Sequence, residues 1–157
     1  MAQNESNRWV MSDKPKILVV DDEISVGTMI VFLLIRGGCD AEMARTADQA
    51  LQLAQVREFD LITLDVELPG TTGFKIYHKL REIPHLKDTP ICFVSGRPTI
   101  ENIQRAFELG AADFIEKPFD AREFISRILF HARRERPASN FPDKNPNPDT
   151  QSLCNTP

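Results

Sequence analysis

The sequence is poor in cysteine and has no hydrophobic segment long enough to cross a membrane. Its three cysteines, Cys39, Cys92 and Cys154, lie far apart without paired spacing, which favours reduced thiols over a disulfide framework. The longest apolar run, residues 29–35, is far shorter than the roughly 20 residues that span a bilayer, and we predict a core helix there. The N-terminus also lacks the apolar region of a signal peptide. We therefore expect a cytoplasmic protein without membrane insertion.

An excess of positive charge is also missing. The 157 residues contain 19 Lys and Arg against 23 Asp and Glu, which gives a net charge of −4. Domains that bind nucleic acid usually carry a basic face and a high pI, so we expect no direct contact with nucleic acid. The three histidines, His78, His85 and His131, form no metal-ligand pattern with the cysteines, and we expect each to be a surface residue.

Composition divides the chain into three zones. Residues 1–15 are mostly polar and non-periodic, and we expect a flexible segment. Residues 16–136 are dense in apolar runs and amphipathic segments, and their number suits one domain. Residues 137–157 carry five of the eleven prolines and four asparagines. Such a tail buries too little apolar surface to offset the entropy of ordering it, so we predict disorder.

The middle zone alternates short strands with helices. Most of the short apolar runs are continuous instead of alternating, which is typical of strands covered on both faces in a parallel sheet. Helical segments between them predict right-handed crossovers and a doubly wound α/β sandwich of five β-α pairs. The predicted strands are 17–20, 41–44, 61–64, 91–94 and 114–115, and the predicted helices are 23–36, 46–57, 74–83, 100–109 and 121–134.

Polar residues of a distinctive kind follow four of these strands. Asp21 and Asp22 come after the first strand, Asp65 after the third, Ser95 at the end of the fourth and Lys117 after the fifth. Ligands of open α/β sheets bind at the carboxyl ends of the strands, where the topology brings such residues together. We expect these five side chains to form one site. Asp113, by contrast, is expected to be a solvated surface charge.

The residue types at this edge suit phosphoryl chemistry. Three carboxylates in a small site repel one another unless a cation lies between them, and oxygen ligands favour a hard ion such as Mg²⁺. Asp65 offers a nucleophile, Lys117 a compact positive charge and Ser95 a hydroxyl for a phosphoryl oxygen. Phosphoryl transfer needs mainly positioning and charge stabilisation.

Taken together, the motifs resemble the receiver domain of two-component response regulators, over about residues 16–136. The resemblance implies a flavodoxin-like (CheY-like) (βα)5 sandwich with a five-stranded parallel sheet in the order 2-1-3-4-5. The residues that carry it are the pair Asp21–Asp22, Asp65 followed by Leu68–Pro69–Gly70, Ser95, and the pair Lys117–Pro118.

Roles at the site follow from the resemblance alone. Asp65 would accept a phosphoryl group from a histidine kinase or a phosphotransfer protein. Asp22 and Asp65 would bind Mg²⁺ (or Mn²⁺) through their side chains, Glu67 through its backbone carbonyl, and Asp21 mostly through a water molecule. Lys117 would contact a phosphoryl oxygen, and its bond to the following proline is expected to be cis.

The resemblance also implies switch and rate-tuning residues. Ser95 would shift toward the phosphate and Phe114 would turn inward behind it. Since the family has a tyrosine or another aromatic residue at this last position, the switch here would work by packing without a hydroxyl bond. Glu67 and Arg97 occupy the positions that tune dephosphorylation in the family. We hypothesise that they form an ion pair across the mouth of the site and hinder the hydrolytic water.

Signalling is expected to use the face formed by the fourth helix, the fifth strand and the fifth helix. Phe130 lies opposite the apolar side of the last helix, so we expect it to be exposed and to offer a contact for a downstream protein target or a second receiver. The short tail indicates a stand-alone receiver with no enzymatic activity beyond its own phosphorylation and dephosphorylation. Three alternatives remain: a phosphorelay intermediate or phosphate sink, a phosphatase with an aspartate nucleophile, and a purely binding receiver.

Overall fold

The computed structural model describes residues 14–133, and the flexible ends predicted for residues 1–15 and 137–157 lie almost wholly outside that range. Five strands form one parallel sheet in the order β2-β1-β3-β6-β7, which confirms the predicted (βα)5 topology. These strands are β1 (Lys16–Val20), β2 (Asp40–Ala44), β3 (Leu61–Leu64), β6 (Ile91–Ser95) and β7 (Asp113–Glu116). A separate two-stranded hairpin consists of β4 (Glu67–Leu68) and β5 (Thr71–Thr72).

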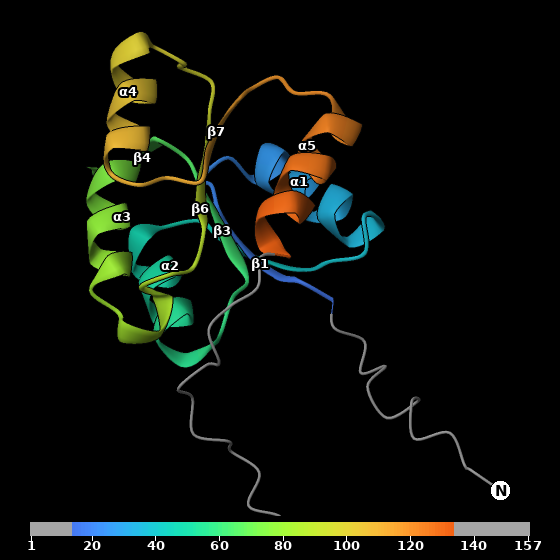
Figure 1. Cartoon of the computed structure of the whole chain (residues 1–157), viewed down its shortest axis with the longest axis horizontal. Helices are drawn as coiled ribbons and strands as arrows, with labels where there is room; N and C mark the ends of the chain where they lie inside the picture. Colours follow the sequence, from blue (N-terminus) through green and yellow to red (C-terminus); the bar gives the residue numbers. More distant parts are fainter. Residues whose placement is uncertain (1–13, 134–157) are drawn as a thin grey trace, which may run out of the picture.

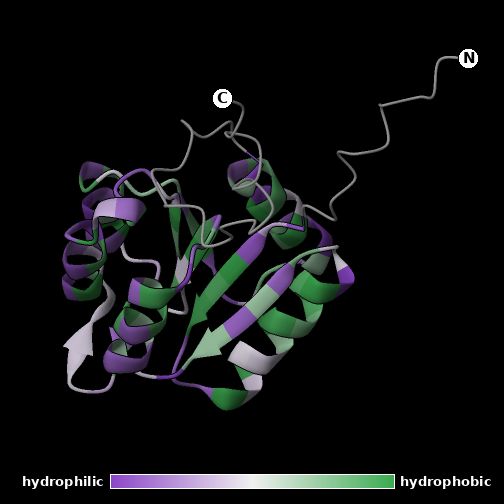
Figure 2. Cartoon of the chain, turned by 90° about the horizontal axis from the view of Figure 1, so that it is seen from below, coloured by the Kyte–Doolittle hydropathy of each residue, from purple (hydrophilic) through white to green (hydrophobic). Residues whose placement is uncertain are grey.

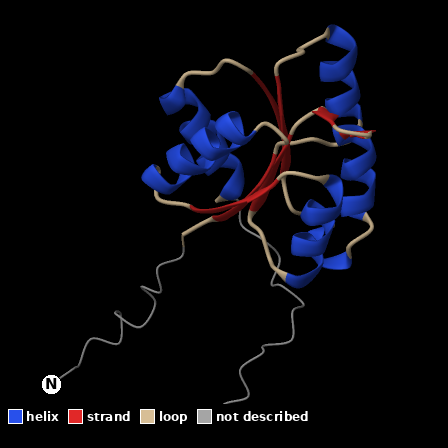
Figure 3. Ribbon diagram, turned by 180° about the vertical axis from the view of Figure 1, so that it is seen from behind, coloured by secondary structure: helices blue, strands red, loops and turns tan. Residues whose placement is uncertain are grey.

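Five α-helices cover the two faces of the sheet, as Figures 1 and 3 show. Helices α1 and α5 lie on one face, and α2, α3 and α4 lie on the other (Figure 1). The helices are α1 (Ile24–Arg36), α2 (Ala47–Val56), α3 (Gly73–Arg81), α4 (Ile100–Glu108) and α5 (Ala121–Ala132), and a 3-10 turn, η2 (Pro84–Leu86), follows α3. No helix in residues 14–133 is long and apolar enough to cross a membrane.

The strands bury both of their faces, as their continuous hydrophobicity predicts. Alternate residues of β1 enter different cores: Leu18 and Val20 pack on the side of α2 and α3, whereas Ile17 and Val19 pack on the side of α1 and α5. Figure 2 shows the strands mostly in hydrophobic colours between the helices. Two cores on opposite faces hold the sheet rigid, so the carboxyl ends of its strands keep fixed positions.

Four of the helices begin with a side-chain cap. In each, the side-chain oxygen of the N-cap residue accepts a hydrogen bond from the backbone N–H three residues later, which satisfies one of the free donors of the first turn. These N-cap residues are Thr46, Thr72, Thr99 and Asp120.

The prediction of a core helix at residues 29–35 is wrong for three of those seven residues. α1 buries Gly27, Ile30 and Leu34, but Met29, Phe32 and Ile35 are exposed. A helix on the outside of a sheet buries only the side that faces the sheet, and the outer side of α1 is exposed. The apolar run therefore forms a surface as well as a core.

Asp113 is part of an ion-pair network and is not the solvated surface charge that the sequence suggested. Its Oδ2 accepts a hydrogen bond from Arg127 Nε at 2.8 Å, and His131 Nε2 lies 3.2 Å from the same oxygen. The side chains of Asp113 and His131 are mostly buried, so the prediction of a surface histidine is also wrong there. His85 is likewise tied into the fold, with Nε2 2.7 Å from the carbonyl oxygen of Ala54.

The same network protects the free edge of the sheet. The backbone N–H of Phe114 donates to Asp113 Oδ1 at 2.8 Å, and Arg127 Nη2 donates to the Phe114 carbonyl at 3.1 Å. β7 is an edge strand, and unpaired backbone groups on an edge invite pairing with other chains. Asp113 and Arg127 thus provide hydrogen-bond partners for the backbone N–H and the carbonyl of Phe114 at this edge.

We predict that Asp113→Asn lowers the free energy of unfolding by about 1–3 kcal/mol at neutral pH, since it removes an ionic acceptor. Burial alone would raise the pKa of Asp113, but the hydrogen bonds from Arg127 and Phe114 N–H outweigh it, and the pKa lies below its usual value. The contribution is therefore present above the unfolded-state pKa and is lost as the pH falls through the folded-state pKa.

Denaturant unfolding of both proteins at pH 7 and at the lowest pH where they fold measures this difference. The exposed Asp88→Asn is the matched control and should leave the free energy of unfolding unchanged at both pH values. A difference between wild type and Asp113→Asn that does not shrink on acidification would contradict the role of the ionised carboxylate.

Candidate functional site

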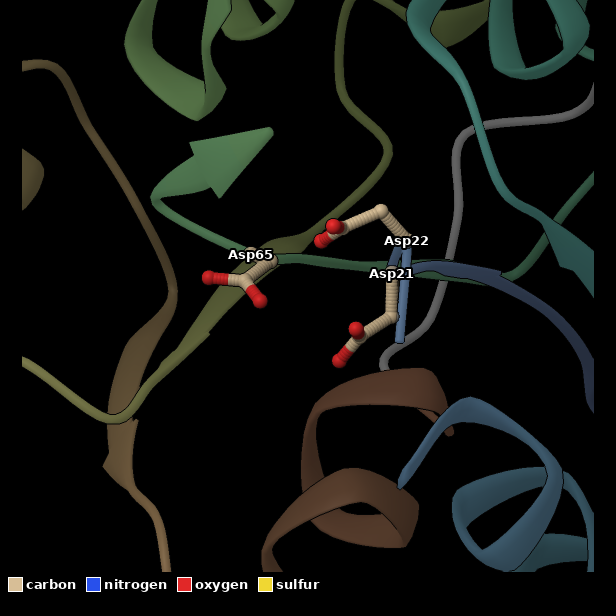
Figure 4. A group of neighbouring side chains, drawn as sticks. All are labelled: Asp21, Asp22 and Asp65. Atoms are coloured by element: carbon tan, nitrogen blue, oxygen red, sulfur yellow. The ribbon is translucent and has the colours of Figure 1, made fainter. Parts of the chain in front are cut away.

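Three carboxylates meet at the carboxyl ends of β1 and β3, as predicted. Asp21 and Asp22 directly follow β1, and Asp65 directly follows the neighbouring strand β3. One oxygen from each lies within 4.8 Å of the other two, and Figure 4 shows the three side chains grouped at this edge. Asp21 is only 2% exposed and Asp65 9%. Such burial of like charges is costly without compensating positive charge.

Lys117 supplies part of that compensation from the end of β7. Its Nζ lies 2.7 Å from Asp21 Oδ2 and 2.9 Å from Asp65 Oδ2, so one ammonium group bonds both carboxylates. The Lys117–Pro118 peptide bond is cis, as predicted. The backbone N–H of Lys117 donates to the carbonyl of Ser95 at 2.9 Å, which anchors the residue to β6.

The charge states at the site follow from these contacts. Burial raises the pKa of Asp65 above its usual value, although the hydrogen bonds from Lys117 and from the Glu67 N–H oppose this. Burial alone would lower the pKa of Lys117, but its bonds to Asp21 and Asp65 outweigh it, and the pKa lies above its usual value. Lys117 therefore stays charged, and one positive charge faces three carboxylates.

The donor set fits a hard divalent cation. Asp21, Asp22 and Asp65 offer only oxygen ligands, and the negative charge exceeds the positive charge of Lys117. Mg²⁺ typically binds through one or two carboxylates and keeps several waters, which an acidic site at an open sheet edge permits. Three of the four residues that the sequence predicts as metal ligands, Asp21, Asp22 and Asp65, are thus brought together, and a role for the Glu67 carbonyl stays a prediction.

One local turn orients the polar side chain at three strand ends. Asp21 Oδ1 accepts a hydrogen bond from the backbone N–H of Glu23 at 2.9 Å, and Asp65 Oδ1 accepts one from the N–H of Glu67 at 3.1 Å. Ser95 Oγ accepts from the N–H of Arg97 at 3.0 Å. In each case the donor lies two residues later, which is the Asx-turn or its serine counterpart. These turns fix the side chains before any ligand binds.

Gly73 holds the loop that carries Asp65, and the sequence analysis missed it. A Cβ at this position would lie 2.1 Å from the backbone oxygen of Asp65, so no larger residue fits without moving the loop. The Gly73 N–H donates to the carbonyl of Val66 at 2.8 Å, which closes the β4–β5 hairpin against the start of α3. Its signal in the sequence is weak, because a glycine at the start of a helix is common for other reasons.

Glu67 and Arg97 form the ion pair that we hypothesised. Arg97 Nε lies 3.3 Å from Glu67 Oε1, and both side chains are largely exposed. The pair joins the β4–β5 hairpin to the loop between β6 and α4, close to Asp65 and Ser95 in the sequence. Exposed pairs are weak, at about 0–1 kcal/mol, so its structural contribution is small. Its effect on dephosphorylation stays a prediction.

The two aromatic residues named from the sequence lie in opposite environments. Phe114 points inward and is almost fully buried. Its ring stacks with that of Phe93, with 6.4 Å between the two ring centroids. Phe130 is 70% exposed on α5, as predicted, next to His131 of the Asp113 network. The inward position of Phe114 suits a residue that senses packing behind the site, while its role as a switch stays a prediction.

Comparison with known proteins identifies the family. The family model described as "response regulator receiver domain" matches residues 17–129. The transcriptional regulatory protein ResD of Bacillus subtilis is 34% identical over 130 residues, which are 83% of this chain and 53% of the relative. PhoB of Pseudomonas aeruginosa, a phosphate regulon transcriptional regulatory protein, is 36% identical over 121 residues, 77% of this chain and 53% of the relative. The chain thus spans about half the length of these curated relatives.

Solved structures agree with the family match. The non-phosphorylated receiver domain of HemR from Leptospira biflexa superposes with a TM-score of 0.72 at 35% identity, over 79% of this chain and 98% of that one. The chemotaxis protein CheY4 of Vibrio cholerae gives a TM-score of 0.71 at 32% identity, over 74% of this chain and 98% of that one. The chain belongs to the response regulator receiver domains of two-component systems.

Proposed function

We propose that Asp65 accepts a phosphoryl group, with Mg²⁺ or Mn²⁺ present, from a histidine kinase or a phosphotransfer protein. The observation that carries this proposal is the place of the Asp65 carboxylate. It lies in the acidic cluster with Asp21 and Asp22 and 2.9 Å from Lys117 Nζ. A carboxylate is an adequate nucleophile, and phosphoryl transfer depends mainly on positioning and charge.

The residues that would hold the metal ion are those at the ends of β1 and β3. Asp22 and Asp65 would bind through their side chains, Glu67 through its backbone carbonyl, and Asp21 mostly through water. When bound, the ion would offset the negative charge of the phosphoryl oxygens. The buried Asp21 would remain bonded to Lys117 and fix the position of that ammonium group.

The transfer step requires one new bond and one broken bond. A carboxylate oxygen of Asp65 bonds to phosphorus as the phosphorus–nitrogen bond of the donor histidine breaks, and the electron pair stays on the imidazole, which takes up a proton. Lys117 is placed to bond a phosphoryl oxygen, since it already reaches Asp65. The hydroxyl of Ser95, at the end of β6, would bond another.

We propose that phosphorylation is signalled through Ser95 and Phe114 to the face of α4, β7 and α5. Ser95 Oγ is held by the Arg97 N–H, which it would release or share on binding phosphate. Phe114 packs between the sheet and the helices on the side of α4. Phe130 on the exposed side of α5 would then contact a downstream protein target or a second receiver, as aromatic residues do at interfaces.

The wider role is also a proposal. ResD and PhoB are transcriptional regulatory proteins by name, and this chain matches about half of each. We propose that the receiver itself acts in the cytoplasm through proteins, without direct contact to nucleic acid. It would have no enzymatic activity beyond its own phosphorylation and dephosphorylation. A phosphorelay intermediate or a phosphate sink would use the same site and differ only in where the phosphoryl group goes next.

A phosphatase with an aspartate nucleophile is the weaker alternative. Such an enzyme needs a second acid two residues after the nucleophile, and Glu67 holds that position. In this fold, however, the Glu67 carboxylate pairs with Arg97 and is largely exposed, instead of being held as a proton donor beside Asp65. Turnover of small phosphate esters would be the property that separates the two functions.

We predict that Mg²⁺ and acetyl phosphate add one phosphoryl group to the wild-type protein and none to Asp65→Asn. Asn keeps the size and the acceptor for the Glu67 N–H but is not a nucleophile. Intact-mass spectrometry measures the adduct, and Asp88→Asn, an exposed acid outside the site, is the matched control. An adduct of unchanged yield on Asp65→Asn would refute the assignment of the acceptor.

Removal of the Glu67–Arg97 pair should shorten the lifetime of the aspartyl phosphate. We predict that Arg97→Ala loses phosphate about two- to fivefold faster, because an exposed pair is worth at most about 1 kcal/mol. The exchange Glu67→Arg with Arg97→Glu restores the pair in reverse and should recover most of the lifetime. Decay of the phosphorylated mass after removal of acetyl phosphate gives the rate. Equal rates for all three proteins would show that the pair does not shield the site.

A further inference from the structure

The outer side of α1 is an apolar surface on a helix that has almost no charge. Ile24, Phe32 and Ile35 are 55%, 58% and 56% exposed, and Met29 is 46% exposed. Arg36 is the only charged residue of the helix, and Figure 2 shows α1 almost entirely in hydrophobic and neutral colours. Single exposed apolar residues are ordinary, but a row of them on one helix indicates an interaction site.

The side chains of this surface are graded in size along the helix. An α-helix has about 3.6 residues per turn, so each turn of α1 contributes residues to the outer side, opposite the buried Gly27, Ile30 and Leu34. Apart from Ile24 at its start, small side chains (Ser25 and Thr28) lie in its first half, and larger ones (Met29, Phe32 and Ile35) follow. We define the α1 face as Ile24, Ser25, Thr28, Met29, Phe32 and Ile35.

We propose that the α1 face binds the α1 face of a second copy of this chain, with the two helices antiparallel. In a two-fold symmetric pair centred near the middle of α1, Phe32 lies opposite Thr28 of the second copy, and Ile35 lies opposite Ser25 of the second copy. Phe32 and Ile35 each then meet a small side chain, Ile24 lies opposite Arg36 at the ends of the contact, and the same contacts occur twice. A parallel pair would place large against large and small against small.

The charges at the two ends of α1 favour the same orientation. Glu23 directly precedes the helix and Arg36 ends it, and both are exposed. An antiparallel pair brings Glu23 next to Arg36 of the second copy at both ends, whereas a parallel pair brings like charges together. The helix macrodipoles are also opposed in the antiparallel pair. Rim charges of this kind fix orientation more than they add affinity.

The size of the surface sets the strength of the dimer. A helix of 13 residues is about 20 Å long, so a single pair of helices buries less than the roughly 1,200 Å² at the lower limit of stable interfaces. We therefore expect a weak, concentration-dependent dimer. This inference does not rest on phosphorylation of Asp65, because the surface is complete without it.

Sedimentation velocity of the whole chain over about a hundredfold range of concentration tests the dimer, since its population follows mass action. The wild type should pass from monomer to dimer. Phe32→Glu and Thr28→Arg should remain monomeric, with the dissociation constant raised at least about tenfold by a charge at the centre of the contact. Val56→Glu, which changes an exposed apolar residue of α2, is the matched control and should dimerise like the wild type.

Charge reversal tests the antiparallel register. Glu23→Arg alone and Arg36→Glu alone should each weaken the dimer, because each places like charges at both ends. A mixture of the two variants should form a heterodimer as tight as the wild-type dimer, since both end pairs are then opposite in sign. Circular dichroism checks that each variant is folded. A mixture no tighter than its components would exclude the antiparallel pair.

Two further outcomes would overturn the proposal. A wild type that stays monomeric at every concentration excludes a second copy as the partner. If, in that case, Phe32→Glu slows phosphorylation by a histidine-phosphorylated protein but not by acetyl phosphate, the α1 face binds the phosphoryl donor instead. A dimer that persists in Phe32→Glu uses another surface. Failure of phosphorylation at Asp65 would leave each of these readouts of oligomeric state unaffected.

Discussion

The bonds from one lysine to two buried carboxylates are the interaction on which the site depends. Lys117 follows the edge strand β7. Its side chain extends along the carboxyl ends of the strands to Asp65, which follows β3, and to Asp21, which follows β1. Removing Lys117 would leave the buried carboxylates of Asp21 and Asp65 without this positive charge, which is strongly unfavourable. The sheet, with a core on each face, keeps these strand ends at fixed distances. The packing that stabilises the sheet therefore also sets the distances between the side chains of the site.

Much of the fold and of the site could be predicted from the sequence because both follow from simple patterns. Continuous apolar runs such as that of β3 predict buried parallel strands, and acids that directly follow them predict a site at the sheet edge. Asp22, Asp65 and Lys117 were found in this way and meet as expected. The Glu67–Arg97 pair was hypothesised because the family resemblance places rate-tuning residues at these two positions, and the structure shows the two side chains paired.

Features that depend on which neighbour covers a residue could not be predicted. The run within α1 has the composition of a core helix, but only contacts in three dimensions show that Phe32 is exposed. Asp113 resembles any surface acid until Arg127, one helix away in the sequence, is seen beside it. Gly73 is required by a close backbone approach to Asp65, a distance that composition does not encode. The sequence determines these features through tertiary packing alone.

The acidic cluster carries more negative charge than Lys117 offsets, and we propose that a divalent cation completes it. Thermal unfolding of wild type and Asp65→Asn, with and without Mg²⁺, measures the effect of this surplus charge. Asp65→Asn removes one surplus charge and should unfold at a higher temperature than the wild type in the absence of metal. Mg²⁺ should raise the unfolding temperature of the wild type and have little effect on the variant. A variant that unfolds earlier without metal, with an equal response to Mg²⁺ in both proteins, would contradict the account.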